Sequence, residues 1–187
     1  LDRDGTLNVE KGHLARPEDL ELFPGTGAAI RQLNRAGIPA IVITNQPVIA
    51  RGEADFADVD AIHRRLENIL AQDGAFLDAI FYCPHHPDKG FAGERPELKI
   101  VCDCRKPASG LIDQACELFN IDRANSWLIG DHERDMECAA NARLKSVLVQ
   151  TGPSAGSLKS AAQPNLTAPD VATAITEILK RLDLAAS

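Results

Sequence analysis

Short apolar runs alternate with amphipathic segments along most of the chain. Apolar positions at helical spacing predict helices over residues 28–36, 59–71, 111–119, 135–142 and 171–182. Short apolar runs between them predict strands over residues 38–43, 77–82, 127–129 and 147–149. Strands that alternate with helices indicate a parallel sheet with crossover helices, so the predicted fold class is α/β. In such sheets the ligand site lies beyond the carboxyl ends of the strands.

The two ends of this pattern carry separate expectations. Residues 152–169 are rich in Gly, Pro, Ser and Ala and are predicted to form a surface connection before the last helix. The chain starts at Leu1, without an initiator Met or a signal peptide. We expect Leu1 to be the remainder of a buried strand that ends at Asp2. We therefore expect the natural chain to begin several residues earlier.

Length and composition favour one globular domain spanning residues 1–187. The chain has 187 residues, of which 44% are hydrophobic and 25% charged, so disordered and fibrous proteins are excluded. No apolar run reaches the roughly 20 residues needed to span a bilayer. The formal net charge of −7 argues against nucleic-acid binding, which needs a basic surface. It still permits a small anionic substrate, because a few local cations and a metal can bind one.

Polar side chains gather at the predicted strand ends and helix starts. Taken alone, the Asp-x-Asp-Gly sequence at residues 2–5 is equally well explained as an Asx turn after a strand. Three further features follow it along the chain, each next to a predicted strand or helix. The side chains concerned are Asp2 and Asp4, then Thr44, then Lys106, and finally Asp131 and Asp135. Four such features in this order favour a catalytic site.

These groups supply the parts needed for phosphoryl transfer. An aspartate can attack phosphorus and form an aspartyl phosphate, which splits one difficult step into two. Mg²⁺ prefers oxygen ligands, so one or two carboxylates and a carbonyl suffice to hold it. A lysine and hydroxyl or amide donors neutralise the charge on the transferring oxygens. We therefore interpret the motifs as the active site of a Mg²⁺-dependent enzyme that transfers phosphoryl groups.

Three of the five cysteines lie close to histidines. An odd cysteine count argues against a disulfide framework. The set Cys83, His85, Cys102 and Cys104 has the Cys₃His composition of structural zinc sites, with His86 as an alternative ligand and unligated loop cysteines as the alternative for the whole set. A closed four-coordinate zinc cannot activate water, so we assign it a structural role in ordering the loop over residues 83–104. Cys116 and Cys138 fall in predicted helices and are expected to pack as small apolar side chains.

The polar motifs resemble the four motifs of the haloacid dehalogenase (HAD) superfamily of phosphatases. The resemblance implies that Asp2 is the nucleophile and that Asp4 is the general acid and base. It also implies that Thr44 and Lys106 hold the phosphoryl oxygens. Mg²⁺ would be bound by Asp2, Asp131 and the backbone carbonyl of Asp4. A separate role is implied for Asp135, which would support the site through a hydrogen bond.

The cysteine-rich segments narrow this resemblance. Residues 82–87 and 102–107 resemble the D,D-heptose 1,7-bisphosphate phosphatases, whose nearest relatives, the histidinol-phosphate phosphatases, share the zinc loop. The similarity runs from residue 1 to about residue 152. It implies a Rossmann-like core without a large cap domain. It also implies a cytoplasmic monomer that removes the C7 phosphate of D-glycero-D-manno-heptose 1,7-bisphosphate during lipopolysaccharide precursor synthesis.

The same resemblance suggests which residues contact the substrate. Arg105 would pair with the distal phosphate, for which a guanidinium fork is well shaped. The chain departs from the family at Pro47-Val48, where Ser-Gly is usual, and at His132, where Lys or Arg is usual; a cationic His132 would still suit a phosphate. The remaining expected contacts are Glu10, Lys11, Gly12, His13 and Asn45. For Lys11 and His13 the alternative is a plain solvated loop, and His63 is expected on a solvated helix face.

Two other functions stay open at this point. Histidinol-phosphate phosphatase activity would place an amine near a carboxylate such as Glu10, whereas a bisphosphate favours Arg105 and His132. A catalytically silent, zinc-stabilised interaction domain belongs to a different class of protein. The complete set of five predicted catalytic and Mg²⁺-binding side chains argues against it.

Overall fold

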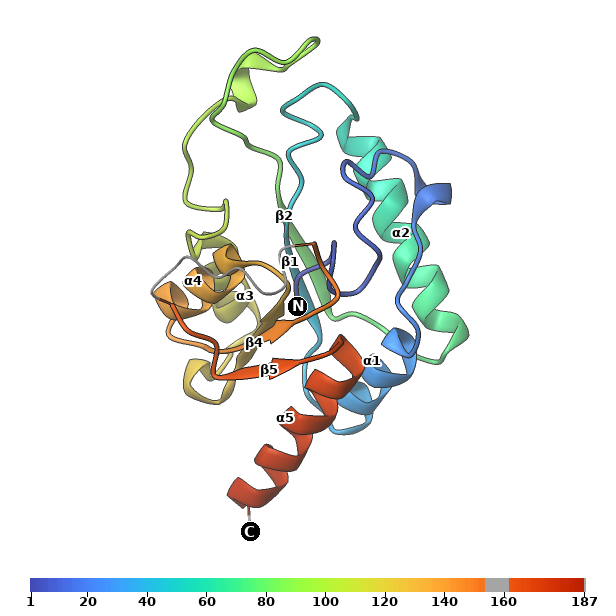
Figure 1. Cartoon of the computed structure of the whole chain (residues 1–187), viewed down its shortest axis with the longest axis vertical. Helices are drawn as coiled ribbons and strands as arrows, with labels where there is room; N and C mark the ends of the chain where they lie inside the picture. Colours follow the sequence, from blue (N-terminus) through green and yellow to red (C-terminus); the bar gives the residue numbers. More distant parts are fainter. Residues whose placement is uncertain (154–161, 187) are drawn as a thin grey trace.

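The computed structural model describes residues 1–153 and 162–186 as an α/β fold with two parallel sheets (Figure 1). In the first sheet, β1 (Ile41–Asn45) pairs with β2 (Ala79–Cys83). In the second, β4 (Lys145–Val149) lies between β3 (Trp127–Gly130) and β5 (Leu166–Ala168). The helices are α1 (Thr26–Arg35), α2 (Phe56–Gln72), α3 (Gly110–Phe119), α4 (Glu133–Ala142) and α5 (Val171–Ala186), with 3₁₀ turns at Pro17–Asp19, Pro96–Leu98 and Arg123–Asn125. None of the described helices has the length and apolar character needed to cross a membrane.

The first two residues of the chain join the two sheets. The amino nitrogen of Leu1 donates to the Ile41 carbonyl at 2.8 Å, and the Ile43 amide donates back to the Leu1 carbonyl at 2.8 Å. On the other side, the Asp2 amide donates to the Ile129 carbonyl at 2.8 Å. The start of the chain therefore bridges β1 and β3 and places Asp2 near the carboxyl ends of both strands.

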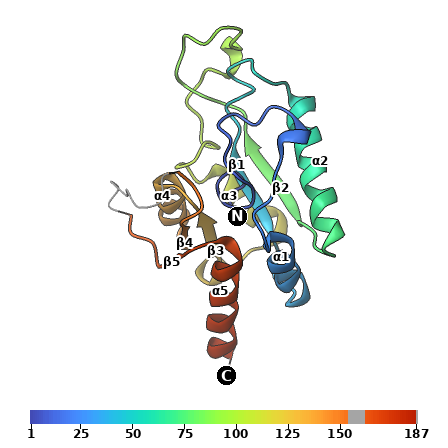
Figure 2. The same cartoon turned by 45° about the vertical axis from the view of Figure 1, so that its right-hand side comes forward.

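Helices cover both faces of this layer. Val42 and Ile129 belong to a hydrophobic cluster formed with α1, α2 and α5. Their strand neighbours Ile41, Ile43 and Leu128 pack instead with α3 and α4. This alternation is the period-two pattern of strands that are buried on both faces. Figures 1 and 2 show α1 and α2 on one side of the strands and α3 and α4 on the other.

The predicted elements are confirmed, with boundaries that shift by up to four residues. β1 begins at Ile41 instead of residue 38, because the Ile38 amide still donates to the Leu33 carbonyl at the end of α1. α2 begins three residues early, since the Asp55 side chain accepts from the Asp58 amide and caps the helix. α4 begins two residues early, because His132 caps it. As the resemblance implied, the described loops carry no large cap domain.

The predicted surface connection over residues 152–169 is wrong at its end. Residues 166–168 form β5, where Leu166 pairs with Val147 and Ala168 with Val149 of β4. A three-residue strand is too short to show a periodic pattern of apolar residues in the sequence. The remainder of the predicted connection includes residues 154–161, which lie outside the described residues.

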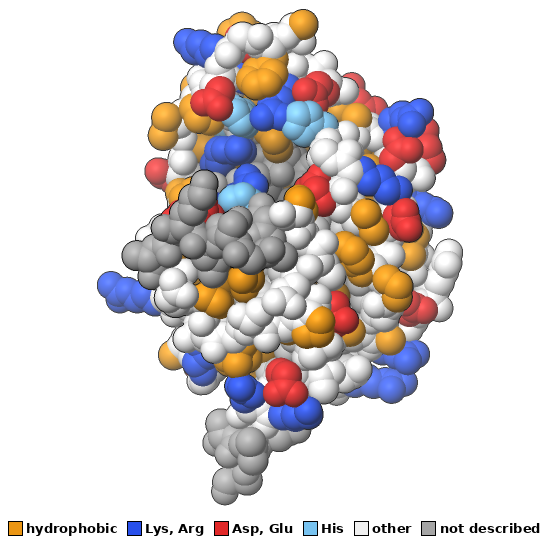
Figure 3. All heavy atoms as spheres, in the orientation of Figure 1, with side chains coloured by type: hydrophobic (Ala, Val, Ile, Leu, Met, Phe, Trp, Pro, Cys, Tyr) orange, Lys and Arg blue, Asp and Glu red, His pale blue; other side chains and the backbone are white. Residues whose placement is uncertain are grey.

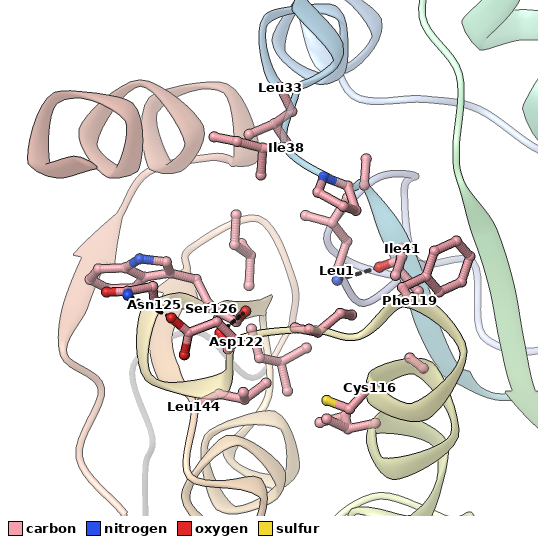
Figure 4. A pocket seen from close by; sticks show the side chains of 18 of the residues that line it. Leu1, Leu33, Ile38, Ile41, Cys116, Phe119, Asp122, Asn125, Ser126 and Leu144 are labelled. Carbon is pink, nitrogen blue, oxygen red and sulfur yellow. Dashed lines mark hydrogen bonds between the residues drawn. The ribbon is translucent and has the colours of Figure 1, made fainter. Parts of the chain in front are cut away.

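An apolar cavity of about 330 Å³ lies at the amino ends of β1 and β3 (Figure 4). In the close-up, Leu1, Leu33, Ile38, Cys116 and Phe119 are among the side chains around it. Most of its lining is aliphatic or aromatic, and its polar residues are Asn120, Asp122, Asn125 and Ser126. It lies at the end of the strands opposite to the predicted chemistry.

Candidate active site

A second, more polar pocket of about 580 Å³ opens at the carboxyl ends of β1 and β3. Histidine, lysine and arginine side chains gather on the upper part of the face seen in Figure 3. Most of the sequence-predicted site residues line the pocket: Asp2, Asp4, Glu10, Gly12, His13, Thr44, Asn45, Arg105, Lys106, Asp131 and His132. Lys11 does not, because its ammonium group is exposed and pairs with Glu21 at 2.9 Å. This geometry does not support the expectation that Lys11 contacts substrate.

Lys106 joins two carboxylates at the floor of this pocket. Its Nζ lies 2.7 Å from Asp2 Oδ1 and 2.6 Å from Asp135 Oδ1. Burial alone would lower the pKa of Lys106, but the charges of Asp135 and Asp2 outweigh it and raise that pKa. Burial also raises the pKa of Asp2, which the charge of Lys106 opposes. A buried ammonium group whose charged form is favoured by both carboxylates therefore lies beside the predicted nucleophile.

Asp131 is enclosed by glycines. A Cβ atom added at Gly152 would lie 1.7 Å from Asp131 Oδ2, and one added at Gly5 would lie 2.5 Å from the same oxygen. Gly5 also has a φ of +76°, which other residues rarely adopt. Burial and the nearby charges of Asp2 and Asp135 raise the pKa of Asp131 to about 8. The close backbones of Gly5 and Gly152 thus hold Asp131 beside like charges, which costs electrostatic free energy.

A divalent cation would relieve this repulsion. Carboxylate oxygens of Asp2, Asp131 and Asp135 all lie within 4.8 Å of one another. An all-oxygen donor set suits Mg²⁺. Both oxygens of Asp135 already accept hydrogen bonds, from Lys106 Nζ and from the His132 amide at 3.1 Å. These contacts agree with the supporting role expected for Asp135. They leave the carboxylates of Asp2 and Asp131 more available as metal ligands.

Asp4 is held by donors from three residues. Arg3 Nη2 lies 2.8 Å from Asp4 Oδ2, Gln46 Nε2 lies 2.9 Å from the same oxygen, and Asn8 Nδ2 lies 3.0 Å from Oδ1. Burial opposes ionisation, but the Arg3 charge and the hydrogen bonds from Asn8 and Gln46 lower the pKa of Asp4. Sequence reasoning did not identify Arg3, Asn8 or Gln46, although all three lie within four residues of a predicted catalytic residue.

His63 is not on a solvated helix face, so that expectation is wrong. The side chain is buried, with 7% exposed, and its Nε2 lies 3.1 Å from Nη1 of the fully buried Arg3. Its neighbours Arg64 and Arg65 on α2 are exposed, as expected. The charges beside His63 in the sequence therefore gave no indication of the direction of its side chain.

The residues at the carboxyl end of β1 organise Lys106 and Thr44. Asn45 Nδ2 donates to the Lys106 carbonyl at 3.1 Å, and the Lys106 amide donates to Asn45 Oδ1 at 3.0 Å. The backbone of Lys106 thus bonds to both the nitrogen and the oxygen of the Asn45 side-chain amide. Asn45 also lines the pocket. Gln46 Nε2 donates to Thr44 Oγ1 at 2.9 Å, which directs the Thr44 hydroxyl. The Asn45 side chain therefore supports the backbone of Lys106, and its expected contact with substrate stays a prediction.

Cys83, His85, Cys102 and Cys104 meet as predicted. Their candidate ligand atoms lie within 4.8 Å of one another, including Cys104 Sγ to His85 Nδ1 at 3.2 Å and to Cys83 Sγ at 3.0 Å. A Cys₃His donor set of this size suits Zn²⁺. His86, the alternative ligand, lies instead in the pocket wall, where its Nε2 is 3.2 Å from Arg51 Nη2. Cys138 is buried and Cys116 is partly buried on the face of α3, both packed with apolar neighbours as predicted.

Three arginines form the cationic wall of the pocket. Arg105, Arg51 and Arg134 all line it, and Arg105 Nη1 donates to the His85 carbonyl at 3.1 Å. Burial lowers the pKa of Arg105, and the charges of Arg134 and Arg51 lower it further. Sequence reasoning missed Arg51 and Arg134, which belong to no recognised motif. This wall suits an anion.

His132 does not supply a further cation. Its Nδ1 accepts from the Arg134 amide at 3.2 Å as the cap of α4, so this nitrogen carries no proton. Burial and the Arg134 charge lower the pKa of His132. The expectation of a cationic His132 is therefore not supported, and the fixed charge near this position comes from Arg134.

Comparison with known proteins gives a consistent set of relatives. A HAD-hydrolase-like family model matches residues 103–174. The chain is 40% identical over 153 residues to a D-glycero-β-D-manno-heptose-1,7-bisphosphate 7-phosphatase of Salmonella typhi, covering 81% of this chain and 79% of the relative. It is 38% identical to the D-glycero-D-manno-heptose-1,7-bisphosphate 7-phosphatase of Thermosynechococcus vestitus, covering 97% and 95%. A crystal structure of the D,D-heptose 1,7-bisphosphate phosphatase of B. bronchiseptica, complexed with magnesium and phosphate, superposes with a TM-score of 0.83 at 34% identity and covers 96% of each chain.

Proposed function

Because the chain belongs to the D-glycero-D-manno-heptose 1,7-bisphosphate 7-phosphatase family of HAD-like hydrolases, we propose that it removes the C7 phosphate of that sugar bisphosphate. One observation carries the proposal at the level of chemistry. The buried Asp2 carboxylate lies 2.7 Å from Lys106 Nζ and within 4.8 Å of Asp131, at the floor of a pocket that Asp4 also lines. A nucleophile, a fixed cation, a metal-binding carboxylate and a general acid and base thus share one site.

The reaction proceeds in two steps. A carboxylate oxygen of Asp2 attacks phosphorus, the bond to the sugar oxygen breaks, and Asp4 gives that oxygen its proton. Water then attacks the aspartyl phosphate, Asp4 takes the proton, and inorganic phosphate leaves with the Asp2 carboxylate restored. The resting contacts of Asp4 all donate to it, so the first step requires proton uptake, which the negative charge of bound phosphate favours.

Lys106 and Thr44 bind the transferring phosphoryl group. The ammonium group of Lys106 is held in place by Asp2 and Asp135, and the Thr44 hydroxyl by Gln46. Mg²⁺ bound by Asp2, Asp131 and the Asp4 carbonyl would neutralise charge on the phosphoryl oxygens. Preorganised charges of this kind lower the barrier because they need no reorganisation during the reaction.

The cationic wall recognises the second phosphate. Arg105 is tied to the His85 carbonyl, so its fork has a defined position in the pocket. Zn²⁺ bound by the Cys₃His set would fix the same segment, because Arg105 directly follows Cys104. Such a zinc ion would be structural and would contribute to specificity by fixing the position of Arg105.

Histidinol phosphate is the second candidate substrate, and one observation favours it. Glu10 lines the pocket, and burial together with the Asp4 charge raises the pKa of Glu10. A substrate amine beside Glu10 would stabilise its ionised form. The three arginines of the cationic wall favour the bisphosphate.

A substrate panel tests the proposal. We expect kcat/KM to be highest for an anomer of heptose 1,7-bisphosphate, compared with fructose 1,6-bisphosphate and histidinol phosphate. A clear preference for histidinol phosphate would replace the first assignment with the second, and no turnover of any phosphate ester would support the silent interaction domain. The family resemblance also leads us to propose a cytoplasmic monomer, which light scattering of the purified protein and cell fractionation test.

A further inference from the structure

Arg3 is a fully buried cation that no step of the reaction uses. Its exposed fraction is 0%, and its guanidinium group divides its donors among three partners. Nε and Nη2 reach Asp4 Oδ1 at 3.2 and 3.0 Å, and Nη2 also reaches Asp4 Oδ2 at 2.8 Å. Nη2 further donates to Gln46 Oε1 at 3.0 Å, and Nη1 to His63 Nε2 at 3.1 Å. The whole head group is thus fixed against the carboxyl that the mechanism needs to aim.

His63 closes this network from a different part of the chain. Arg3 Nη1 can only donate, so the Nε2 atom of His63 accepts and carries no proton. Burial and the Arg3 charge lower the pKa of His63 to about 3, which keeps the ring neutral. The ring also packs against Tyr82, with centroids 5.2 Å apart, so α2 and β2 fix its orientation.

We propose that His63 is a positioning residue that fixes the Arg3 guanidinium and thereby aims the Asp4 carboxyl at the leaving-group oxygen; the inference rests on the proposed function. Without an acceptor at position 63, Nη1 of a fully buried arginine would lack a partner. Leaving a buried charged donor unpaired is costly, so the guanidinium group would rotate toward other acceptors. Asp4 would move with it, because three of the hydrogen bonds to Asp4 come from Arg3.

The dependence on the leaving group separates positioning from general structural damage. A nitrophenolate leaves without needing a proton, whereas a sugar or alkyl alkoxide depends on the general acid. In His63→Leu we expect kcat for the best alkyl phosphate of the substrate panel to fall about tenfold or more, with KM nearly unchanged. We expect kcat for p-nitrophenyl phosphate to change less than about threefold. His63→Gln supplies an acceptor oxygen and is expected to restore most of the loss.

Arg64→Ala is the matched control, because Arg64 is the exposed neighbour of His63 on α2 and should leave both substrates unaffected. The proposal would be overturned if His63→Leu and His63→Gln each lost as much kcat on p-nitrophenyl phosphate as on the alkyl phosphate. Unchanged kinetics in His63→Leu would overturn it as well. If His63→Leu does not fold, His63→Gln compared with His63→Asn, whose shorter amide cannot reach Arg3, decides the same question. The comparison uses whichever alkyl phosphate the enzyme prefers. A wrong assignment of the heptose substrate would therefore appear in the substrate panel and would not change the comparison of the His63 variants.

Discussion

Lys106 Nζ donates to Asp135 Oδ1 at 2.6 Å, although the two residues are 29 positions apart. Both side chains are almost fully buried. The other oxygen of Asp135 accepts from the His132 amide at the start of α4, so Asp135 ties the helix to the lysine. Asp2 is the second partner of the same ammonium group. The position of this buried ammonium group is therefore set in part by a residue that need not touch substrate.

Asp135→Asn should weaken both activity and stability. The amide keeps the shape of the side chain but removes one of the two negative charges that hold Lys106. Breaking a buried ion pair commonly costs about 3–5 kcal/mol, and the remaining Asp2 partner makes the lower part of that range the expected loss. Urea unfolding and phosphate release measure the two effects. Asp113→Asn, which breaks the partly exposed pair with Arg123, is the control and should cost less than about 1 kcal/mol.

Asp2→Asn should abolish Mg²⁺-dependent phosphate release while the protein stays folded. An amide is a poor nucleophile, so no aspartyl phosphate forms. Release of inorganic phosphate and the far-UV circular dichroism spectrum together check this. Asp60→Asn, which alters a carboxylate that accepts from the Tyr82 hydroxyl outside the pocket, should retain activity. Turnover that persists in Asp2→Asn would rule out covalent catalysis by this residue.

Purified protein should contain about one tightly held zinc ion per chain. Cys102→Ser should lose that metal, because serine is a poor zinc ligand, and should weaken binding of a bisphosphate through the displaced Arg105 segment. Cys116→Ser, which alters a cysteine of α3 outside the set, should keep the zinc. Metal analysis by mass spectrometry checks both variants. Wild-type protein free of zinc, with all of its thiols reactive, would contradict the assignment.

The stability of the protein should fall in acid partly because of His63. Its pKa lies near 3 in the folded protein and near 6.5 when the group is unperturbed. Between these pH values the unfolded chain binds more protons, so the free energy of unfolding decreases as pH falls, by at most about 1.4 kcal/mol per pH unit for this group. His63→Gln should therefore show a shallower decrease in urea midpoint from about pH 7 to about pH 4. Equal slopes in the variant and the wild type would show that His63 is not protected from protonation.

The sequence alone was enough to predict which residues next to strand ends would lie together in the site. Asp2, Thr44 and Asp131 could be predicted to lie close together, because the carboxyl ends of parallel strands meet at one edge of the sheet. The meeting of Arg3 with His63 could not be predicted, since it depends on how α2 packs over a loop 60 residues away in the chain. Spacing alone also could not predict that the Asn45 side chain bonds to the backbone of Lys106, 61 positions away.

The bond from Arg105 to the His85 carbonyl also bears on how this enzyme could diversify. Both ends of the cysteine-rich segment meet at the Cys₃His set, so the intervening residues 86–101 form a loop (here called the cassette) whose two ends are held together. Because His86 lines the pocket, insertions or deletions next to it would alter the pocket wall, while Asp2 and Asp135 would still hold Lys106. Exchange of this cassette between relatives is thus a route to new substrate preferences that leaves the phosphoryl-transfer chemistry intact.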